Sequence, residues 1–235
     1  MKIEYLFINL STFFIKRNTI EMNTKLILGS FTILLGSLFV ACDKHEVIPA
    51  PADIVDLKVH FEGNINGTFV EYTDDVDGFN GETSDAQYIL TSPQPSTVSY
   101  YCDMTSNLIN RSLKVGLGSI YWDAGAIEKP LVEDFNAFFT SKKDVTTIPY
   151  TTGAVDGFEV IYTDNFNNVW TSSETSVNPQ SVLFTAIEND SDNTGDYSKF
   201  TVEFSCYLYR TVTQIPLVID SIRIDNGVFD GWFKR

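Results

Sequence analysis

The chain has 235 residues, of which 43% are hydrophobic and 14% aromatic, and a formal net charge of −15 at pH 7. The aromatic content argues against a disordered chain and favours a single domain with a substantial core. The negative charge makes nucleic acid and anionic lipid head groups poor partners, because both would be repelled.

The first feature along the chain is the apolar run 26–41, which ends at Cys42. As a helix it would span about 24 Å, which is less than the ~30 Å hydrocarbon core of a bilayer. A charged start, a short apolar segment and small residues before a cysteine resemble a bacterial lipoprotein signal peptide. Val40-Ala41-Cys42 matches the end of a lipobox, although Phe39 stands where leucine is usual. We therefore predict that residues 1–41 are a signal peptide and that Cys42 is lipidated, the alternative being an uncleaved anchor.

Residues 1–21 carry an apolar stretch of their own, which makes the charged start unusually long. Met22 begins a more ordinary signal, and we expect it to be the true initiator, a genuine extended leader being the alternative. Three acyl chains on Cys42 would make detachment from the membrane negligible. Residues 42–53, charged and proline-bearing, are predicted to be a lipidated tether.

From residue 54 the hydrophobic pattern changes to the period of two that is typical of β-strands. Asn66-Gly67 is a hairpin signal between the first two strands. The clearest alternation is at 199–209, where Phe200, Val202, Phe204, Cys206 and Leu208 are predicted to share one face. The predicted strands are 57–62, 68–73, 86–91, 97–104, 112–122, 157–163, 169–173, 181–187, 199–209, 217–224 and 228–233, with a turn at 225–227.

One segment, residues 130–140, follows the helical period instead. Its spaced apolar residues are Leu131, Phe135, Phe138 and Phe139, and Glu133 and Asp134 suit the positive end of a helix dipole. We predict one short helix there and a mainly β domain over residues 54–235. The architecture is expected to be an antiparallel β-sandwich, jelly-roll or immunoglobulin-like, or a partly closed barrel, with the sandwich favoured.

Two cysteines, Cys102 and Cys206, follow Cys42. An envelope compartment is oxidising, so a disulfide between them is one interpretation. Two free thiols that act as small core side chains are the other.

Two acidic segments raise the question of calcium. Asp74, Asp75, Asp77 and Glu82 include the Asp-x-Asp-Gly rhythm of a calcium loop, but Ser84 stands where an EF-hand needs a bidentate glutamate. A loose surface calcium site is one interpretation. Aspartates that accept backbone amides in an acidic turn are the other. The same two interpretations apply to residues 190–196, which contain Asp190, Asp192, Asn193 and Asp196.

The sequence gives little support to an enzyme. Its two histidines are His45, in the tether, and His60, on the polar side of the first strand. Hydrolase, zinc-protease and P-loop motifs are not found in the sequence, and Ser119 follows Gly116-Leu117-Gly118 in a glycine-spaced strand rather than a nucleophile elbow. Carboxylate pairs for glycan cleavage stay an alternative, because an acidic chain offers many of them.

Aromatic residues suggest glycan binding, because sugar rings stack on exposed aromatic side chains. Adjacent Tyr100 and Tyr101 must point to opposite faces of a strand, so one of them is expected to be exposed. The competing interpretation is that these side chains belong to the core or to cross-strand pairs. The candidates are Tyr100 (or Tyr101), Trp122, Trp170, Tyr207, Tyr209 and Trp232.

The second half of the chain resembles a family of uncharacterised cell-surface lipoproteins of Bacteroidota. The likeness covers residues 130–235 and is carried by the segments 160–164, 169–172, 202–209 and 224–231. The charged residues after Cys42 are similar to signals that export such lipoproteins to the outer face of the outer membrane. The resemblance implies this location and supplies no activity.

These observations together predict an outer-membrane lipoprotein, at the cell surface rather than the periplasmic face. Its domain is expected to bind or scaffold a glycan or an envelope protein without catalysis. No cofactor is expected, apart from the possible calcium ion.

Overall fold

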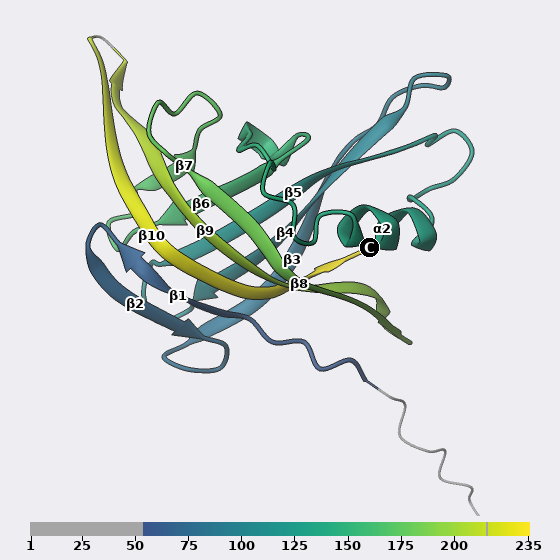
Figure 1. The fold of residues 1–235 in the computed structure, drawn as a ribbon, viewed down its shortest axis with the longest axis horizontal. Helices are drawn as coiled ribbons and strands as arrows, with labels where there is room; N and C mark the ends of the chain where they lie inside the picture. The colour runs from purple at the N-terminus through teal and green to yellow at the C-terminus, as the bar shows by residue number, and fades with distance from the viewer. Residues whose placement is uncertain (1–53, 215) are drawn as a thin grey trace, which may run out of the picture. The chain divides into compact units, whose positions relative to one another are not determined.

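The computed structural model describes residues 54–214 and 216–235, so Cys42, His45, the signal peptide and the tether lie outside the described residues. The described chain forms ten strands, one α-helix and one 3-10 turn (Figure 1). They are β1 His60–Ile65, β2 Thr68–Thr73, β3 Phe79–Tyr88, β4 Ser96–Ser106, β5 Ser112–Trp122, α2 Val132–Thr140, the turn Thr152–Ala154, β6 Phe158–Thr163, β7 Val169–Ser172, β8 Ser181–Asp192, β9 Gly195–Gln214 and β10 Leu217–Lys234.

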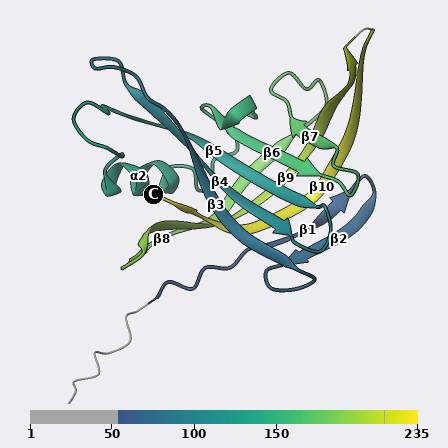
Figure 2. The same ribbon diagram turned by 180° about the vertical axis from the view of Figure 1, so that it is seen from behind.

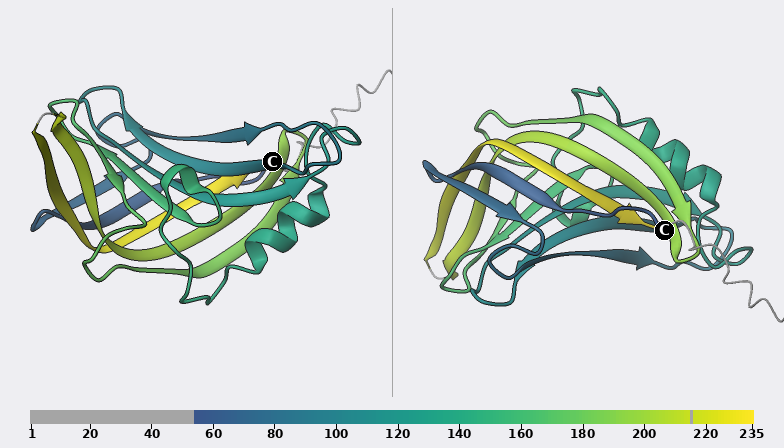
Figure 3. Two further views of the ribbon diagram at one scale, coloured as in Figure 1. Left: turned by 90° about the horizontal axis from the view of Figure 1, so that it is seen from above. Right: turned by 90° about the horizontal axis from the view of Figure 1, so that it is seen from below.

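All ten strands belong to one antiparallel sheet, in the order β2-β1-β10-β9-β7-β6-β5-β4-β3, with β8 paired to β9 beside this path. The sheet curls around its own interior, and β10 contacts β3 and β4 across it (Figure 3). The predicted mainly β, antiparallel class is confirmed. Of the two predicted architectures, the partly closed barrel is the correct one, because the described strands form one curled sheet rather than the two facing sheets of a sandwich.

The interior of the curl is filled by aromatic and aliphatic side chains. The predicted stripe on β9 is confirmed, because Phe200, Val202, Phe204, Cys206 and Leu208 are all buried in the core. Aromatic rings contact each other through much of the interior, in stacked and edge-to-face pairs such as Phe200–Phe233 and Phe158–Phe204. Burial of this apolar area is the main stabilisation of the fold.

The predicted helix is confirmed as α2. Phe135 and Phe139 are fully buried, and both rings lie edge-on to the inward-facing Tyr100. Phe139 also stacks on Phe233 near the end of β10. Leu131 is at the N-cap position, before the first helical residue, and its side chain is exposed. Its predicted place in the buried apolar stripe is therefore wrong.

Two strand predictions are corrected. Residues 225–227 do not form a turn, because β10 continues through them with a bulge in which Asp225 and Asn226 oppose Ser205 alone. Asn226 adopts a left-handed conformation (φ 50°) and its amide donates to Ser205 Oγ at 3.0 Å. The strand expected at 86–91 is β3, which begins earlier and is mostly polar because it is an edge strand paired only with β4.

Cys102 and Cys206 are free thiols in the structure, so the disulfide is not found. Each is buried in the core, where burial raises the pKa of both thiols to about 12. Both therefore stay protonated and act as the small core side chains of the alternative interpretation.

The two ends of the described domain are attached to one turn, between β8 and β9. The amide of Val55 donates to Asp192 Oδ2 at 3.0 Å, and the Arg235 guanidinium contacts Asp196 Oδ2 at 2.7 Å. The β9–β10 hairpin projects at the far side of the sheet from the C-terminus (Figure 2). Within residues 54–214 and 216–235, the structure contains no helix of the length and hydropathy needed to cross a bilayer.

Candidate functional site

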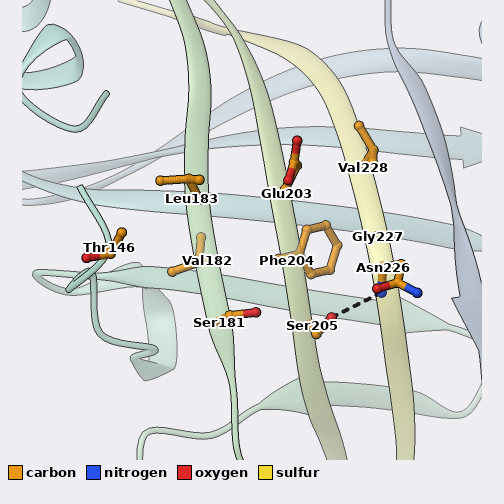
Figure 4. Close-up of a pocket in the computed structure, with 10 residues that line it drawn as sticks. All are labelled: Thr146, Ser181, Val182, Leu183, Glu203, Phe204, Ser205, Asn226, Gly227 and Val228. Atoms are coloured by element: carbon orange, nitrogen blue, oxygen red, sulfur yellow. Dashed lines mark hydrogen bonds between the residues drawn. The ribbon is translucent and has the colours of Figure 1, made fainter. Parts of the chain in front are cut away.

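Two hollows on the outer face of the sheet are candidate sites. The first is a groove of about 380 Å³ over β8, β9 and β10 (Figure 4). Leu183, Glu203 and Val228 form one cross-strand row along it. Glu203 is exposed, and the groove contains no buried charged group. It therefore lacks a polar group held in place for recognition.

The second hollow, of about 500 Å³, lies over β3 to β7 on the outer face of the sheet. The strand register places Ser84, Tyr101, Gly116 and Glu159 next to one another in one row across four strands. A second row contains Asp103, Lys114, Ile161 and Thr171. We call this hollow the Glu159 pocket; it is lined by Ser84, Asp85, Ala86, Tyr101, Lys114, Thr152, Gly153, Glu159, Ile161 and Thr171.

The buried side chains around this pocket are separate from the core. Tyr101 and Ala154 are buried, yet neither belongs to the core cluster. Tyr100, next to Tyr101 in β4, and Phe158, next to Glu159 in β6, do belong to it. Adjacent residues of a strand point to opposite faces, which explains the separation. The sheet thus buries a second, smaller group of side chains on its outer face.

Glu159 is the most enclosed charged side chain of the described residues, with 3% of its surface exposed. Its Oε1 accepts the Gly153 amide at 2.8 Å, and its Oε2 accepts the Tyr101 hydroxyl at 3.5 Å. Burial raises the pKa of the Glu159 carboxyl above its usual range, while these two hydrogen bonds oppose the rise. Burial, with the nearby Glu159 charge, also raises the pKa of Tyr101 to about 12, so its hydroxyl stays protonated and donates.

Lys114 provides the positive charge at the pocket. Its ammonium lies 3.2 Å from Asp103 Oδ2 and 5.0 Å from the centre of the Tyr101 ring. Burial raises the pKa of Asp103 despite this ion pair. Among the ion pairs of the described residues none involves Glu159. Lys114 pairs with Asp103, and its charge only partly opposes the rise in the pKa of Glu159.

One wall of the pocket is the turn Thr152–Ala154, which packs directly on β5. A Cβ at Gly116 would lie 2.4 Å from the Tyr101 ring, and one at Gly118 would lie 2.4 Å from the Ala154 carbonyl oxygen. Ala154 has a left-handed backbone (φ 48°), and its carbonyl accepts the Ser99 hydroxyl at 2.9 Å. A strained non-glycine residue held by its surroundings is typical of functional sites. The two glycines of the predicted strand around Ser119 therefore leave the space in which this turn packs.

The pocket offers hydrogen-bonding groups of several kinds within one hollow. Glu159 accepts, the Lys114 ammonium donates, and the hydroxyls of Ser84, Thr152 and Thr171 do both. Asp85 pairs with the inward-facing Tyr100, so its side chain points to the other face of the sheet. Because the turn and strands fix Glu159 before any ligand arrives, binding would cost little reorganisation.

The predicted aromatic platform is not assembled. Tyr100, Trp122 and Trp170 are buried, and Trp170 lies under the Arg210 guanidinium at 4.4 Å. Tyr207, Tyr209 and Trp232 are half-buried against Arg223, Ser176 and Tyr197 respectively. Tyr100 and Tyr101 do point to opposite faces, as predicted, but both are buried, so the expected exposure of one is wrong.

The calcium prediction finds no assembled site in the described chain, because no group of three or more candidate metal ligands is gathered there. Asp74 accepts the Gly81 amide at 2.9 Å, and Asp75 and Asp77 occupy left-handed turn positions before Glu82 in β3. In the second loop, Asp192 accepts the amides of Thr194 and Gly195. Both segments match the acidic-turn interpretation, although Asp190 pairs with Lys199 and Asp196 with Arg235.

His60 lies on the outer face, as predicted, between Glu71 at 3.3 Å and Asp230 at 3.7 Å. Apart from Tyr101, the residues of the pocket were not predicted from the sequence. The signal that could have indicated them is Gly116-Leu117-Gly118, since two glycines on one face of a strand leave room for another segment.

No protein-family model matches the chain, and no curated protein or solved structure is significantly similar to it. The functional interpretation therefore rests on the residues described above.

Proposed function

We propose that the protein is an outer-membrane lipoprotein of the cell surface whose β-domain binds a glycan, without catalysis, in the Glu159 pocket. The observation that carries the binding proposal is a buried, preorganised carboxylate beside a lysine and several hydroxyls in a hollow of about 500 Å³. Ligand sites typically combine such a hollow with a few fixed polar groups.

A glycan suits this lining better than a protein surface does. Its hydroxyls can donate to the Glu159 carboxylate and accept from Lys114. A protein partner would be expected to use a broad apolar patch instead. Most of the residues that line this pocket are of polar types.

Binding is tested by titrating the protein with neutral and charged oligosaccharides in a calorimeter. Glu159→Gln is expected to weaken binding by about tenfold, because it removes a hydrogen bond to a charged group. Glu203→Gln is the matched control, since it removes the same charge from the other hollow, and it should bind normally. Equal losses in both variants would contradict the assignment of the site. Failure of every oligosaccharide to bind, together with a stoichiometric protein recovered from solubilised envelopes, would replace the glycan by a protein partner.

The membrane anchor is proposed from Cys42 and its preceding segment alone. Cells fed a labelled fatty acid should incorporate the label into the wild-type protein and not into the Cys42→Ser variant. Protease added to intact cells should digest the domain if it faces outward. If the variant stays labelled, or still fractionates with membranes and keeps its leader, the anchor proposal is wrong.

A glycan-active enzyme is the second candidate, because a carboxyl with a raised pKa lines the pocket and a second carboxyl lies in the neighbouring row of the outer face. Burial makes Glu159 suited to donate a proton, and Asp103 would be the second carboxylate of the pair. Release of reducing ends from oligosaccharides, lost in both Glu159→Gln and Asp103→Asn, would support catalysis. Binding without any cleavage supports the module proposed above.

A further inference from the structure

The charges around the Glu159 pocket do not balance. Lys114 is paired with Asp103 at 3.2 Å, so the Glu159 carboxylate is the charge of the lining without an ion pair. The Asp85 side chain does not contribute, because Asp85 pairs with the inward-facing Tyr100 and therefore points to the inner face of the sheet. Glu159 is 3% exposed, so water screens its charge poorly. The hollow beside Glu159 is therefore a place where a positive charge is favoured.

The two hydrogen bonds that Glu159 accepts leave room for more. A carboxylate can accept about four hydrogen bonds, and Glu159 accepts one from Gly153 and one from Tyr101. Both donors are neutral and lie on the wall of the pocket. The remaining lone pairs can bind an ammonium group, which donates three hydrogen bonds at once.

We infer that the ligand carries a protonated amine among its hydroxyl groups, as a hexosamine with a free amino group does. The ammonium would bind Glu159, while the hydroxyls would contact Lys114, Ser84 and the threonines of the lining. This inference rests on the proposed function and specifies its ligand class. It also agrees with the chain's net charge of −15, which attracts cationic ligands over longer distances.

The test compares three probes of matched size in calorimetric titrations. A glucosamine oligosaccharide has both amine and hydroxyl groups, its N-acetylated counterpart has hydroxyls without the charge, and an aliphatic diamine has the charge without hydroxyls. The free-amine oligosaccharide is expected to bind about tenfold or more tightly than the other two, because it alone forms charge-assisted and neutral hydrogen bonds together.

Three variants separate a site from general attraction between opposite charges. Glu159→Gln should abolish the preference for the free amine, whereas Glu203→Gln should keep it, although both variants lose one negative charge. Lys114→Met should strengthen binding of the amine and weaken binding of the acetylated oligosaccharide, because it removes a competing ammonium and a hydrogen-bond donor. Thermal unfolding of each variant checks that the domain is still folded.

The possible results distinguish failure of the inferred ligand class from failure of the proposed glycan site. Equal binding of the free and acetylated oligosaccharides would overturn the inference and leave the proposed glycan module standing. Equal binding of the diamine and the amino oligosaccharide would also overturn it, because the hydroxyls would then contribute nothing. If no probe binds, both the inference and the proposed function fail. Equal effects of Glu159→Gln and Glu203→Gln would reduce the preference to nonspecific charge attraction and reject the site.

Discussion

The two faces of the sheet bury side chains for different purposes. On the inner face, Phe61, Phe158 and Phe229 are completely buried among other apolar groups, so their burial stabilises the fold. On the outer face, Glu159 and Tyr101 are almost as deeply buried, yet one is a carboxylate whose desolvation opposes folding. Stability alone does not favour such a group, and its presence in a preformed hollow is what binding requires.

The largest effect should follow from a change to the inner face. Phe229→Ala removes a ring that contacts Phe61 and Phe200, and should lower the free energy of unfolding by about 3–5 kcal/mol. Urea denaturation followed by circular dichroism measures this loss. If the loss were below about 1 kcal/mol, the inner face would not be the main source of stability.

A smaller loss of stability is expected from a change on the outer face of β5. Gly116→Ala places a Cβ against the Tyr101 ring and should cost about 1–3 kcal/mol of unfolding free energy, and ligand binding with it. Adding Tyr101→Leu to this variant should recover part of the stability, because the ring that clashes is gone. Additive losses in the double variant would show that Tyr101 and Gly116 are not coupled.

The Glu159 carboxyl should make the stability of the domain depend on pH. The pKa of Glu159 is raised in the folded protein, so its contribution to stability is complete below the unfolded value near 4.5 and is lost as pH rises through the folded pKa. Relative to wild type, Glu159→Gln should therefore gain stability as the pH rises from 4 to 7. Urea denaturation at several pH values measures the trend, and a difference that does not vary with pH would contradict it.

The smallest effect should come from an exposed carboxylate. Asp192 accepts backbone amides from Val55, Thr194 and Gly195, which lower its pKa to about 2, the opposite direction to Glu159. The stability that this group contributes is present above the unfolded pKa and lost only as the pH falls through about 2. An NMR titration should place its midpoint there, and Asp192→Ala should accelerate hydrogen exchange of the Val55 amide. A midpoint near 4 would show that these hydrogen bonds do not persist in solution.

Local patterns in the sequence predicted the elements better than their assembly. The helix and the β9 stripe followed directly from spacing, and Asn66-Gly67 makes the predicted hairpin with both residues at positive φ. The sandwich was favoured wrongly, because alternation within a strand says which side is buried and not whether the buried sides belong to one curled sheet. The β10 bulge at Asn226 was read as a turn because the same residue types suit both.

The candidate site could not be predicted, because it depends on register. Tyr101, Gly116 and Glu159 are separated in the sequence and become neighbours only when β4, β5 and β6 pair in one particular alignment. The aromatic candidates failed for a related reason. Most of the named tyrosines and tryptophans lie in long strands, where a neighbouring strand or loop covers them.

The attachment of Val55 and Arg235 to one turn has a practical consequence for engineering. Because Val55 and Arg235, near the two ends of the described residues, are both held at the β8–β9 turn, a short linker could join the ends and new ones could be opened elsewhere. The projecting β9–β10 hairpin, on the far side of the sheet, is a suitable place for the cut, since its outer residues pair only with each other. Such a circular permutant would carry the Glu159 pocket unchanged while presenting it from the opposite end of the domain.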